Sequence, residues 1–259
     1  MRAKKSEIDR LGAPDILAIL RAADELIARG GRSLLAKVLK GSRDKKVLEH
    51  GLDACPSYGY FRDKTLDEIT ERIDWMIQQD FLEIEMSGKL PLIVFTERGW
   101  KVERAQYAEE MLREWDRWIA EGKAEIDPTY LKDRNRGMIL LFLKLLRWSG
   151  DTRYIPYLRQ WEKIDCKKVQ AAIRETIREL ERGIDREAAA AEREQYEREI
   201  QQALRIAPLE PEVLKCWECG KRFVFAVEEQ KFFRMKGFEP PKRCPACRER
   251  KRLRNIGIE

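Results

Sequence analysis

The stretch TLDEITERIDWMIQQDFLEIEMSGKLPLIVF, residues 65–95, decides the fold of the N-terminal part of the chain. Thr65 and Glu68 form the pattern of a capping box, in which a hydroxyl and a carboxylate satisfy the first free N–H groups of a helix. Apolar residues then recur at helical spacing, and two short apolar runs, 81–86 and 92–95, follow around a glycine-containing turn. The pattern predicts a helix followed by a β-hairpin.

Three further helical segments precede this stretch. Apolar residues at helical spacing predict helices over 14–27, 33–40 and 45–52, and Gly30-Gly31 and Gly41-Ser42 separate them. Helices followed by a β-hairpin are the order of a winged helix, so we expect this fold in a first domain over residues 1–104.

The rest of the chain divides into two further predicted domains. Residues 105–206 have a helical pattern throughout, with breaks at Gly122, Asp127-Pro128 and 149–151. Residues 207–259 contain four of the six cysteines and form the third predicted domain. The predicted fold class is mainly α: a winged helix with a β-hairpin wing, a helical middle domain and a small C-terminal zinc ribbon.

Two CxxC pairs predict a metal site in the third domain. They are Cys216-Trp-Glu-Cys219 and Cys244-Pro-Ala-Cys247, and each pair can bring two sulfurs to one ion. Four thiolates form the tetrahedral shell that structural Zn²⁺ prefers, and they leave no position for a catalytic water. We therefore expect one structural zinc ion. A redox dithiol or an iron–sulfur centre explains two pairs in a basic segment less well.

The cysteine pairs belong to a longer recognisable pattern. The stretch CWECGKRFVFAVEEQKFFRMKGFEPPKRCPACRERKR, from residue 216 onward, resembles the probable zinc-ribbon domain of small bacterial proteins. That family has the pattern CxxCGxxFxF, then a helix, then PxRCPxCR. The resemblance implies a bound metal and does not identify a partner.

Positive charge is concentrated in two segments. Charged residues make up 38% of the chain, and of the net charge of +6 the largest share falls in residues 209–259, with 13 basic and 8 acidic side chains. A second cluster, residues 32–46, has six basic side chains and one acid. Localised positive charge favours a phosphate-bearing partner. The alternative for each segment is a solvated face.

The N-terminal segment resembles the RQC winged-helix domain of RecQ helicases. The residues that carry the resemblance are GRSLLAKVLKGSRDKKVLEHGLDACPSYGYFRDKT (31–65), IDWMIQQDFLEIE (73–85) and LPLIVFTERGW (90–100). In that family a basic residue followed by Gly-Ser meets the DNA backbone, which implies this role for Lys40-Gly41-Ser42. With the C-terminal cations, the predicted DNA-binding residues are Arg32, Ser33, Lys37, Lys40, Ser42, Arg43, Lys45, Lys46, Lys64, Lys89, Arg248, Arg250 and Lys251.

Two departures from that family limit the predicted activity. The sequence has no GxxxxGK[ST] loop to hold a nucleotide phosphate. Some family members have an aromatic residue at the wing tip that separates the first base pair, and here the tip has Met86 and Leu90 instead. We therefore expect binding of duplex or branched DNA without unwinding, and no nucleotide cofactor.

The middle domain gives the weakest functional signal. Residues 136–180 are similar to HEAT-like repeats in a GDxxxIPxL turn and in the helix that follows it. At most one and a half units are visible, whereas stacked repeats need about three. A plain helical domain remains the alternative.

The sequence predicts a non-enzymatic DNA-binding protein, because it contains no recognisable catalytic constellation. It has no apolar run of the ~20 residues that span a membrane, and the polar N-terminus lacks an apolar signal core. We expect a cytoplasmic protein, nucleoid-associated if it binds DNA. Two alternatives stay open: a protein–protein scaffold that acts through the helical middle, and an RNA- or ribosome-associated protein.

Overall fold

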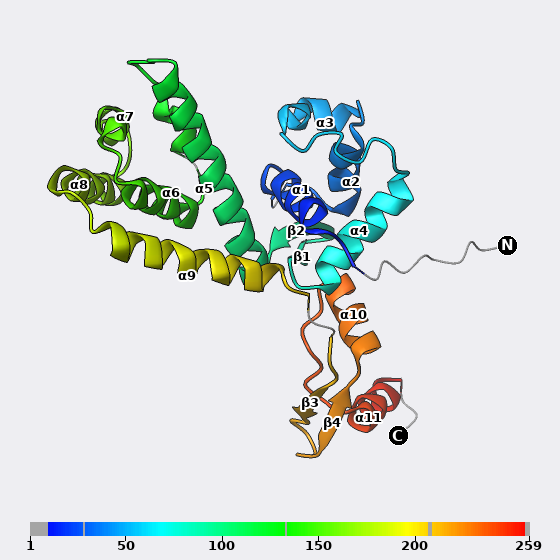
Figure 1. Ribbon diagram of the computed structural model, residues 1–259. Coiled ribbons are helices and arrows are strands. Elements are labelled where there is room, and N and C mark those ends of the chain that lie inside the picture. Colours follow the sequence, from blue (N-terminus) through cyan, green and yellow to red (C-terminus); the bar gives the residue numbers. More distant parts are fainter. Residues whose placement is uncertain (1–9, 28, 133, 207–208, 257–259) are drawn as a thin grey trace. The chain divides into compact units, whose positions relative to one another are not determined.

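The computed structural model describes residues 10–27, 29–132, 134–206 and 209–256 (Figure 1). Its contacts divide the chain into two compact units: Met1–Gly99 with Ile206–Glu259, and Trp100–Arg205. The first unit therefore combines the two ends of the chain. The polar N-terminal stretch, residues 1–9, lies outside the described residues.

The N-terminal part of the first unit is a set of helices followed by a hairpin. Its elements are α1 (Ala13–Asp24), α2 (Arg32–Lys40), α3 (Lys45–Glu49), the 3-10 turn η1 (Leu52–Ala54), α4 (Leu66–Gln78), β1 (Leu82–Ser87) and β2 (Leu90–Phe95). This is the element order that the sequence predicts for a winged helix. The third predicted helix is shorter than expected, because Gly51 adopts a left-handed conformation and η1 follows.

Helix α4 begins with the predicted capping box. The Thr65 hydroxyl accepts a hydrogen bond from the Glu68 N–H at 3.2 Å, and the Glu68 carboxylate accepts from the Thr65 N–H at 2.7 Å. One face of α4 is buried by Ile69, Ile73 and Met76, and the helix packs against α2. Burial of this face joins α4 to the core.

The wing is an antiparallel hairpin with a tight turn. Its register runs from Leu82 opposite Phe95 to Ser87 opposite Leu90. Ile84 and Ile93 are paired and buried, whereas the tip residue Leu90 is 66% exposed. The core therefore holds the base of the wing and leaves its tip in solvent.

The C-terminal part of the first unit contains β3 (Glu212–Lys215), β4 (Arg222–Phe225), α10 (Val227–Lys236) and α11 (Pro245–Asn255). Strands β3 and β4 pair antiparallel. Helix α10 packs on α4 and β1, where the Arg234 guanidinium donates a hydrogen bond to the Gln78 carbonyl at 2.7 Å. Strand β3 was not predicted from the sequence.

The second unit is helical. Its elements are α5 (Glu97–Ala120, whose first turn belongs to the first unit), η2 (Pro128–Leu131), α6 (Arg136–Ser149), η3 (Thr152–Tyr154), α7 (Ile155–Glu162), α8 (Lys167–Arg182) and α9 (Arg186–Leu204). Its core centres on Trp115, which meets Phe142 and Trp161 edge to face at centroid distances of 4.9 and 6.1 Å. No residue of α9 is buried, in keeping with its highly charged sequence.

Two cysteines lie outside the CxxC pairs, and the sequence suggests that both are buried. Cys55 is buried, but Cys166 is exposed immediately before α8, so this expectation is wrong for Cys166. None of the helices in the described ranges combines the length and the apolar character needed to cross a bilayer.

Candidate metal centre and nucleic-acid interface

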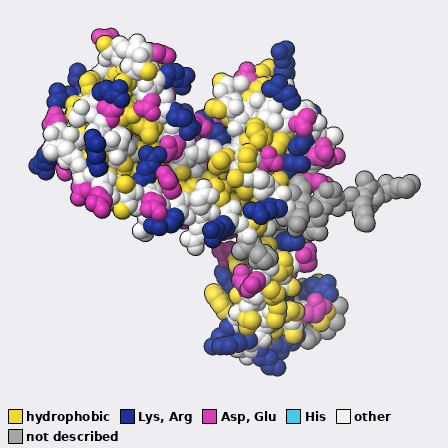
Figure 2. All heavy atoms as spheres, viewed as in Figure 1, with side chains coloured by type: hydrophobic (Ala, Val, Ile, Leu, Met, Phe, Trp, Pro, Cys, Tyr) yellow, Lys and Arg dark blue, Asp and Glu magenta, His cyan; other side chains and the backbone are white. Residues whose placement is uncertain are grey.

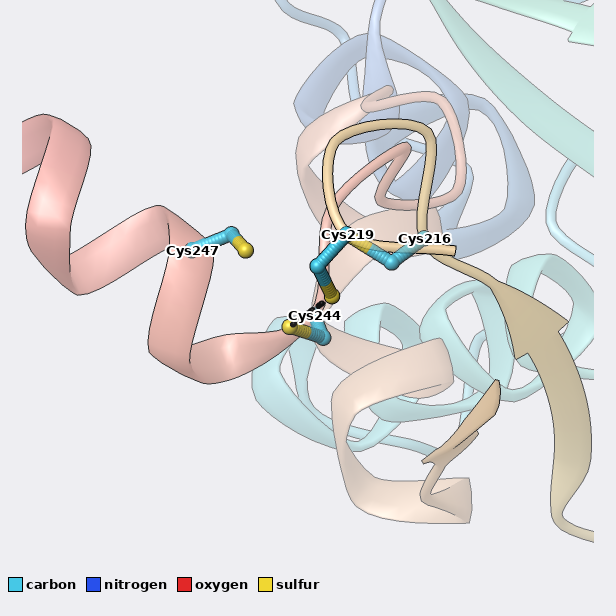
Figure 3. A group of neighbouring side chains, drawn as sticks. All are labelled: Cys216, Cys219, Cys244 and Cys247. Atoms are coloured by element: carbon cyan, nitrogen blue, oxygen red, sulfur yellow. Dashed lines mark hydrogen bonds between the residues drawn. The ribbon is translucent and has the colours of Figure 1, made fainter. Parts of the chain in front are cut away.

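The four paired cysteines converge on one point. One sulfur from each of Cys216, Cys219, Cys244 and Cys247 lies within 4.8 Å of all the others, and the sulfurs of Cys219 and Cys244 are 3.8 Å apart (Figure 3). Four sulfurs placed about 2.3 Å from one ion in a tetrahedron lie about 3.8 Å from each other. The site therefore fits a single zinc ion.

The first cysteine pair lies in a tight turn between β3 and β4. The Cys216 N–H donates to the Lys221 carbonyl at 2.9 Å, and the Gly220 N–H donates to the Cys216 carbonyl at 3.0 Å. Gly220 has a φ of +71°, a conformation that a glycine adopts without steric cost. We call this turn, residues 215–222, the knuckle.

The second cysteine pair lies at the start of a helix. Cys244 occupies the N-cap position of α11, and Cys247 lies in its first turn. The free N–H groups of a helix N-terminus favour thiolates. A knuckle, a hairpin and a helix that supplies the last two ligands make this module a treble clef, which refines the zinc ribbon expected from the sequence.

The protein environment acts differently on the individual thiols. The backbone N–H groups of Cys219 and Cys244 lower the pKa of the Cys216 thiol to about 6. Burial raises the pKa of the Cys247 thiol to about 12, so metal binding must displace a proton there. The Arg250 guanidinium donates to the Cys247 sulfur at 2.9 Å and offsets negative charge at the centre. With four protein ligands the zinc is structural.

Several predicted DNA-binding residues have partners inside the protein. Arg32 pairs with Asp74 at 2.7 Å, and Lys37 pairs with Asp44 at 2.7 Å. The Lys40 ammonium donates to two backbone carbonyls, those of Arg62 and Lys64, at 2.7 Å each. These three cations hold α2 to its neighbours.

Other predicted residues are available to a ligand. Arg43, Lys46 and Lys89 are exposed, and their side chains make no hydrogen bond or ion pair with the described residues. The Lys45 side chain is 86% exposed and forms an ion pair with Glu49 at 3.5 Å. A contact at this distance between exposed groups contributes little. The cations near α3 that a ligand can reach therefore lie at positions 43, 45 and 46, of which only Lys45 has an ion pair, and a weak one.

The two predicted serines and Lys64 differ in their roles. The Ser42 hydroxyl accepts a hydrogen bond from the Asp44 N–H at 3.2 Å, whereas Ser33 is exposed in the first turn of α2. Lys64 contacts the adjacent Asp63 at 3.1 Å. Asp44 caps α3 through the Lys46 N–H, and the Lys37 ammonium, more than that N–H, lowers the pKa of the Asp44 carboxyl.

A cavity of about 390 Å³ lies between α2, α3 and the wing. Four cations and one imidazole line it: Arg29, Arg32, Lys37, Lys46 and His50. No carboxylate is among its lining residues. Residues 90–93 of β2 form an apolar wall. Neither Arg29 nor His50 is among the DNA-binding residues that the sequence predicts. The position of Arg29 next to Gly30-Gly31 is the one local signal that could have indicated it.

The predicted cations of the C-terminal helix are only partly available. Arg248 pairs with Glu229 at 2.6 Å, and Arg250 contacts the metal ligand Cys247. Lys251 is exposed, and its side chain makes no hydrogen bond or ion pair with the described residues. Two of the three therefore stabilise the treble clef itself.

Comparison with known proteins agrees with this geometry. Residues 12–114 match the RQC domain. This N-terminal segment thus resembles an RQC domain, and we call residues 12–114 the RQC-like module. Residues 212–255 match the family described as a probable treble clef domain. No solved structure matches the chain significantly.

A curated relative supports the RQC-like module. The ATP-dependent DNA helicase RecQ of Bacillus subtilis (strain 168) is 34% identical over 74 residues, which are 29% of this chain and 12% of that protein. The chain thus covers only a small part of the relative. Both resemblances seen in the sequence are confirmed. The two family matches leave residues 115–211 uncovered, so the HEAT-like character of the middle stays a prediction.

Proposed function

We propose that this protein binds duplex or branched DNA through its RQC-like module and does so without catalysing a reaction. The observation that carries the proposal is the match of residues 12–114 to the RQC domain, together with the exposed cations at positions 43, 45 and 46. The matched relative is a DNA helicase by name. In this chain the treble clef has a structural zinc site, and its cations add to the positive charge.

The charge distribution of the module supports a phosphate partner. Arg43 and Lys46 are exposed without a side-chain partner among the described residues, and Lys46 also lines the basic cavity. Lysine and arginine contacts to phosphates release counterions and supply affinity without base specificity. We therefore expect recognition of the shape and charge of the DNA backbone.

The wing tip favours binding over strand separation. Met86 and Leu90 are 50% and 66% exposed there. Neither side chain provides an aromatic face, and base–aromatic stacking contributes about 1–3 kcal/mol per base. We therefore expect the wing to contact a forked duplex without separating its base pairs.

The test is a fluorescence-anisotropy titration of the zinc-loaded chain with blunt and forked duplexes at several salt concentrations. The variant is Arg43→Glu/Lys45→Glu/Lys46→Glu. The matched control reverses three exposed lysines of the second unit, Lys163→Glu/Lys167→Glu/Lys168→Glu. We expect the first variant to lose affinity, with a salt slope shallower by about 0.9 for each lost phosphate contact, and the control to bind like the wild type.

Three results would contradict the proposal in whole or in part. One is equal affinity and salt slope for the wild type and the triple reversal at positions 43, 45 and 46. Another is a clear preference for structured RNA over both duplexes, which would favour the RNA-associated alternative. Metal-dependent cleavage of the labelled DNA would overturn the non-enzymatic part.

A further inference from the structure

Trp217 is a large apolar residue that lies almost entirely in solvent. Its side chain is 76% exposed, the highest value among the large hydrophobic residues exposed in the described ranges. By contrast, Trp115 and Trp161 are completely buried in the second unit. Tryptophan is enriched at the surfaces through which proteins bind their partners.

The knuckle holds the backbone of Trp217 in place. The residue lies between two metal ligands, Cys216 and Cys219, and its N–H donates to the Lys242 carbonyl at 2.9 Å. A group that is already ordered loses little conformational freedom when a ligand stacks on it. The backbone that presents the indole is therefore already ordered before a ligand binds.

One cation lies beside the indole, and three more belong to the knuckle. The Lys242 ammonium lies 5.3 Å from the centroid of the Trp217 ring. On the adjoining hairpin, Lys215 and Arg222 are direct cross-strand partners, and like charges in this arrangement destabilise a sheet. Neither residue, nor Lys221 between them, makes an ion pair with a residue that the structure describes. An anion bound beside the hairpin would relieve this repulsion.

Lys242 pairs with Glu239 at 2.9 Å, but Glu218, the acid of the knuckle, does not pair with Lys215, Lys221 or Arg222. Glu218 accepts a hydrogen bond from Arg243 at 2.8 Å and lies 4.0 Å from Arg250. Its charge is thus directed to two arginines, one of them on α11. Lysine and arginine side chains gather at the end of the treble clef that contains β3 and β4 (Figure 2).

We propose that the knuckle is a second binding site, at which an unpaired base of a nucleic-acid strand stacks on Trp217 while neighbouring phosphates meet Lys215, Lys221 and Arg222. Aromatic faces accept any base, and adjacent cations follow the backbone. A protein partner fits this surface less well, because lysine is depleted in the cores of protein interfaces. The inference rests on the proposed function, and it supplies the stacking surface that the wing tip lacks.

The experiment uses the zinc-loaded full chain and a duplex with a single-stranded dT overhang, beside a blunt duplex, dT15 and rU15. Affinity is followed by anisotropy, and stacking is followed by intrinsic tryptophan fluorescence. The variants are Trp217→Ala and Trp217→Phe. The matched control is Phe232→Ala, because Phe232 is an exposed aromatic of the same module outside the knuckle. One zinc per chain in each variant confirms that the module is folded.

Stacking predicts a specific set of results. Trp217→Ala binds the overhang duplex on the order of tenfold more weakly, Trp217→Phe recovers most of the affinity, and blunt-duplex binding stays unchanged. Single strands quench the wild-type fluorescence, and this quenching disappears in both Trp217 variants. The relative affinities for dT15 and rU15 show which kind of strand the site takes.

Other outcomes separate the two proposals. In one outcome the Trp217 variants bind the overhang duplex like the wild type and show the same fluorescence quenching, while the charge reversal at positions 43, 45 and 46 weakens duplex binding. This result would overturn the stacking site alone. Loss of overhang binding in Trp217→Ala, with no effect of the charge reversal near α3, would overturn the RQC-like interface alone. Absence of binding to every strand would overturn both, and the exposed Trp217 would then indicate a protein contact.

Discussion

The ammonium of Lys40 lies 2.7 Å from the backbone carbonyl oxygen of Lys64 and equally close to that of Arg62. The sequence places Lys40 in the Lys-Gly-Ser motif that the RQC resemblance assigns to DNA. In the folded protein its side chain joins the end of α2 to the loop before α4. Its main contribution is therefore to stability, and DNA affinity is expected to come from its neighbours.

Substitution of Lys40 should lower stability, whereas substitution of Arg43 should lower DNA affinity. Lys40→Met removes two charge-assisted hydrogen bonds at a partly exposed site, so we expect a loss of about 1 kcal/mol and a midpoint of thermal unfolding that is roughly 2–4 °C lower. Arg43→Met, at a residue without a side-chain partner in the described ranges, should leave the midpoint unchanged and weaken DNA binding. Calorimetry and anisotropy on both variants check this, and identical profiles would contradict it.

Removal of one zinc ligand should unfold the treble clef selectively. Cys247→Ser leaves three of the four sulfurs that converge on the site, and structural zinc contributes folding free energy directly. We expect zinc below one equivalent per chain and fast amide hydrogen exchange over residues 212–255. The helices of the second unit, which have their own core, should stay protected. Cys166→Ser, at an exposed cysteine outside the site, is the control and should retain one zinc.

The docking of the treble clef on the wing should depend on Gly237. This residue has a φ of +66°, and a Cβ atom there would lie 2.4 Å from the Ile84 carbonyl oxygen. Gly88 has a similar φ of +63° with nothing within 4 Å of such an atom. Both alanine variants incur the left-handed backbone cost of about 1 kcal/mol. Only Gly237→Ala should lower stability further, because its Cβ atom meets the Ile84 carbonyl. The difference between the two unfolding midpoints then measures the destabilisation caused by this steric overlap.

The stability contributed by Asp44 should decrease in acid. The Lys37 ammonium and the Lys46 N–H hold the pKa of the Asp44 carboxyl below its usual value. A lowered pKa in the folded state means that the carboxylate stabilises the protein above about pH 4 and that this stabilisation is lost as the pH falls through the folded-state pKa. The difference in unfolding free energy between wild type and Asp44→Asn should therefore shrink in denaturant titrations at successively lower pH. A constant difference would show that the charge of Asp44 contributes nothing.

Local patterns let the sequence predict the elements and the metal ligands. The Thr65–Glu68 capping box and the wing turn depend on residues within a few positions of each other, and both form as predicted. The CxxC spacing restricts two sulfurs to one side of a turn, so two pairs were enough to identify all four ligands. The predicted third helix was too long because Gly51 begins a new turn, a conformation that periodicity does not reveal.

The sequence by itself determined that this protein has a mainly helical fold, an RQC-like segment and a four-cysteine zinc site, because short-range geometry and recognisable motifs encode these features. Only the tertiary structure decided which cations are free. The partners of Lys40 and Arg32 are more than 20 residues away in the chain, and spacing alone cannot indicate them. The fold likewise buries Trp115 and exposes Trp217, since burial depends on what packs against a side chain and not on its type.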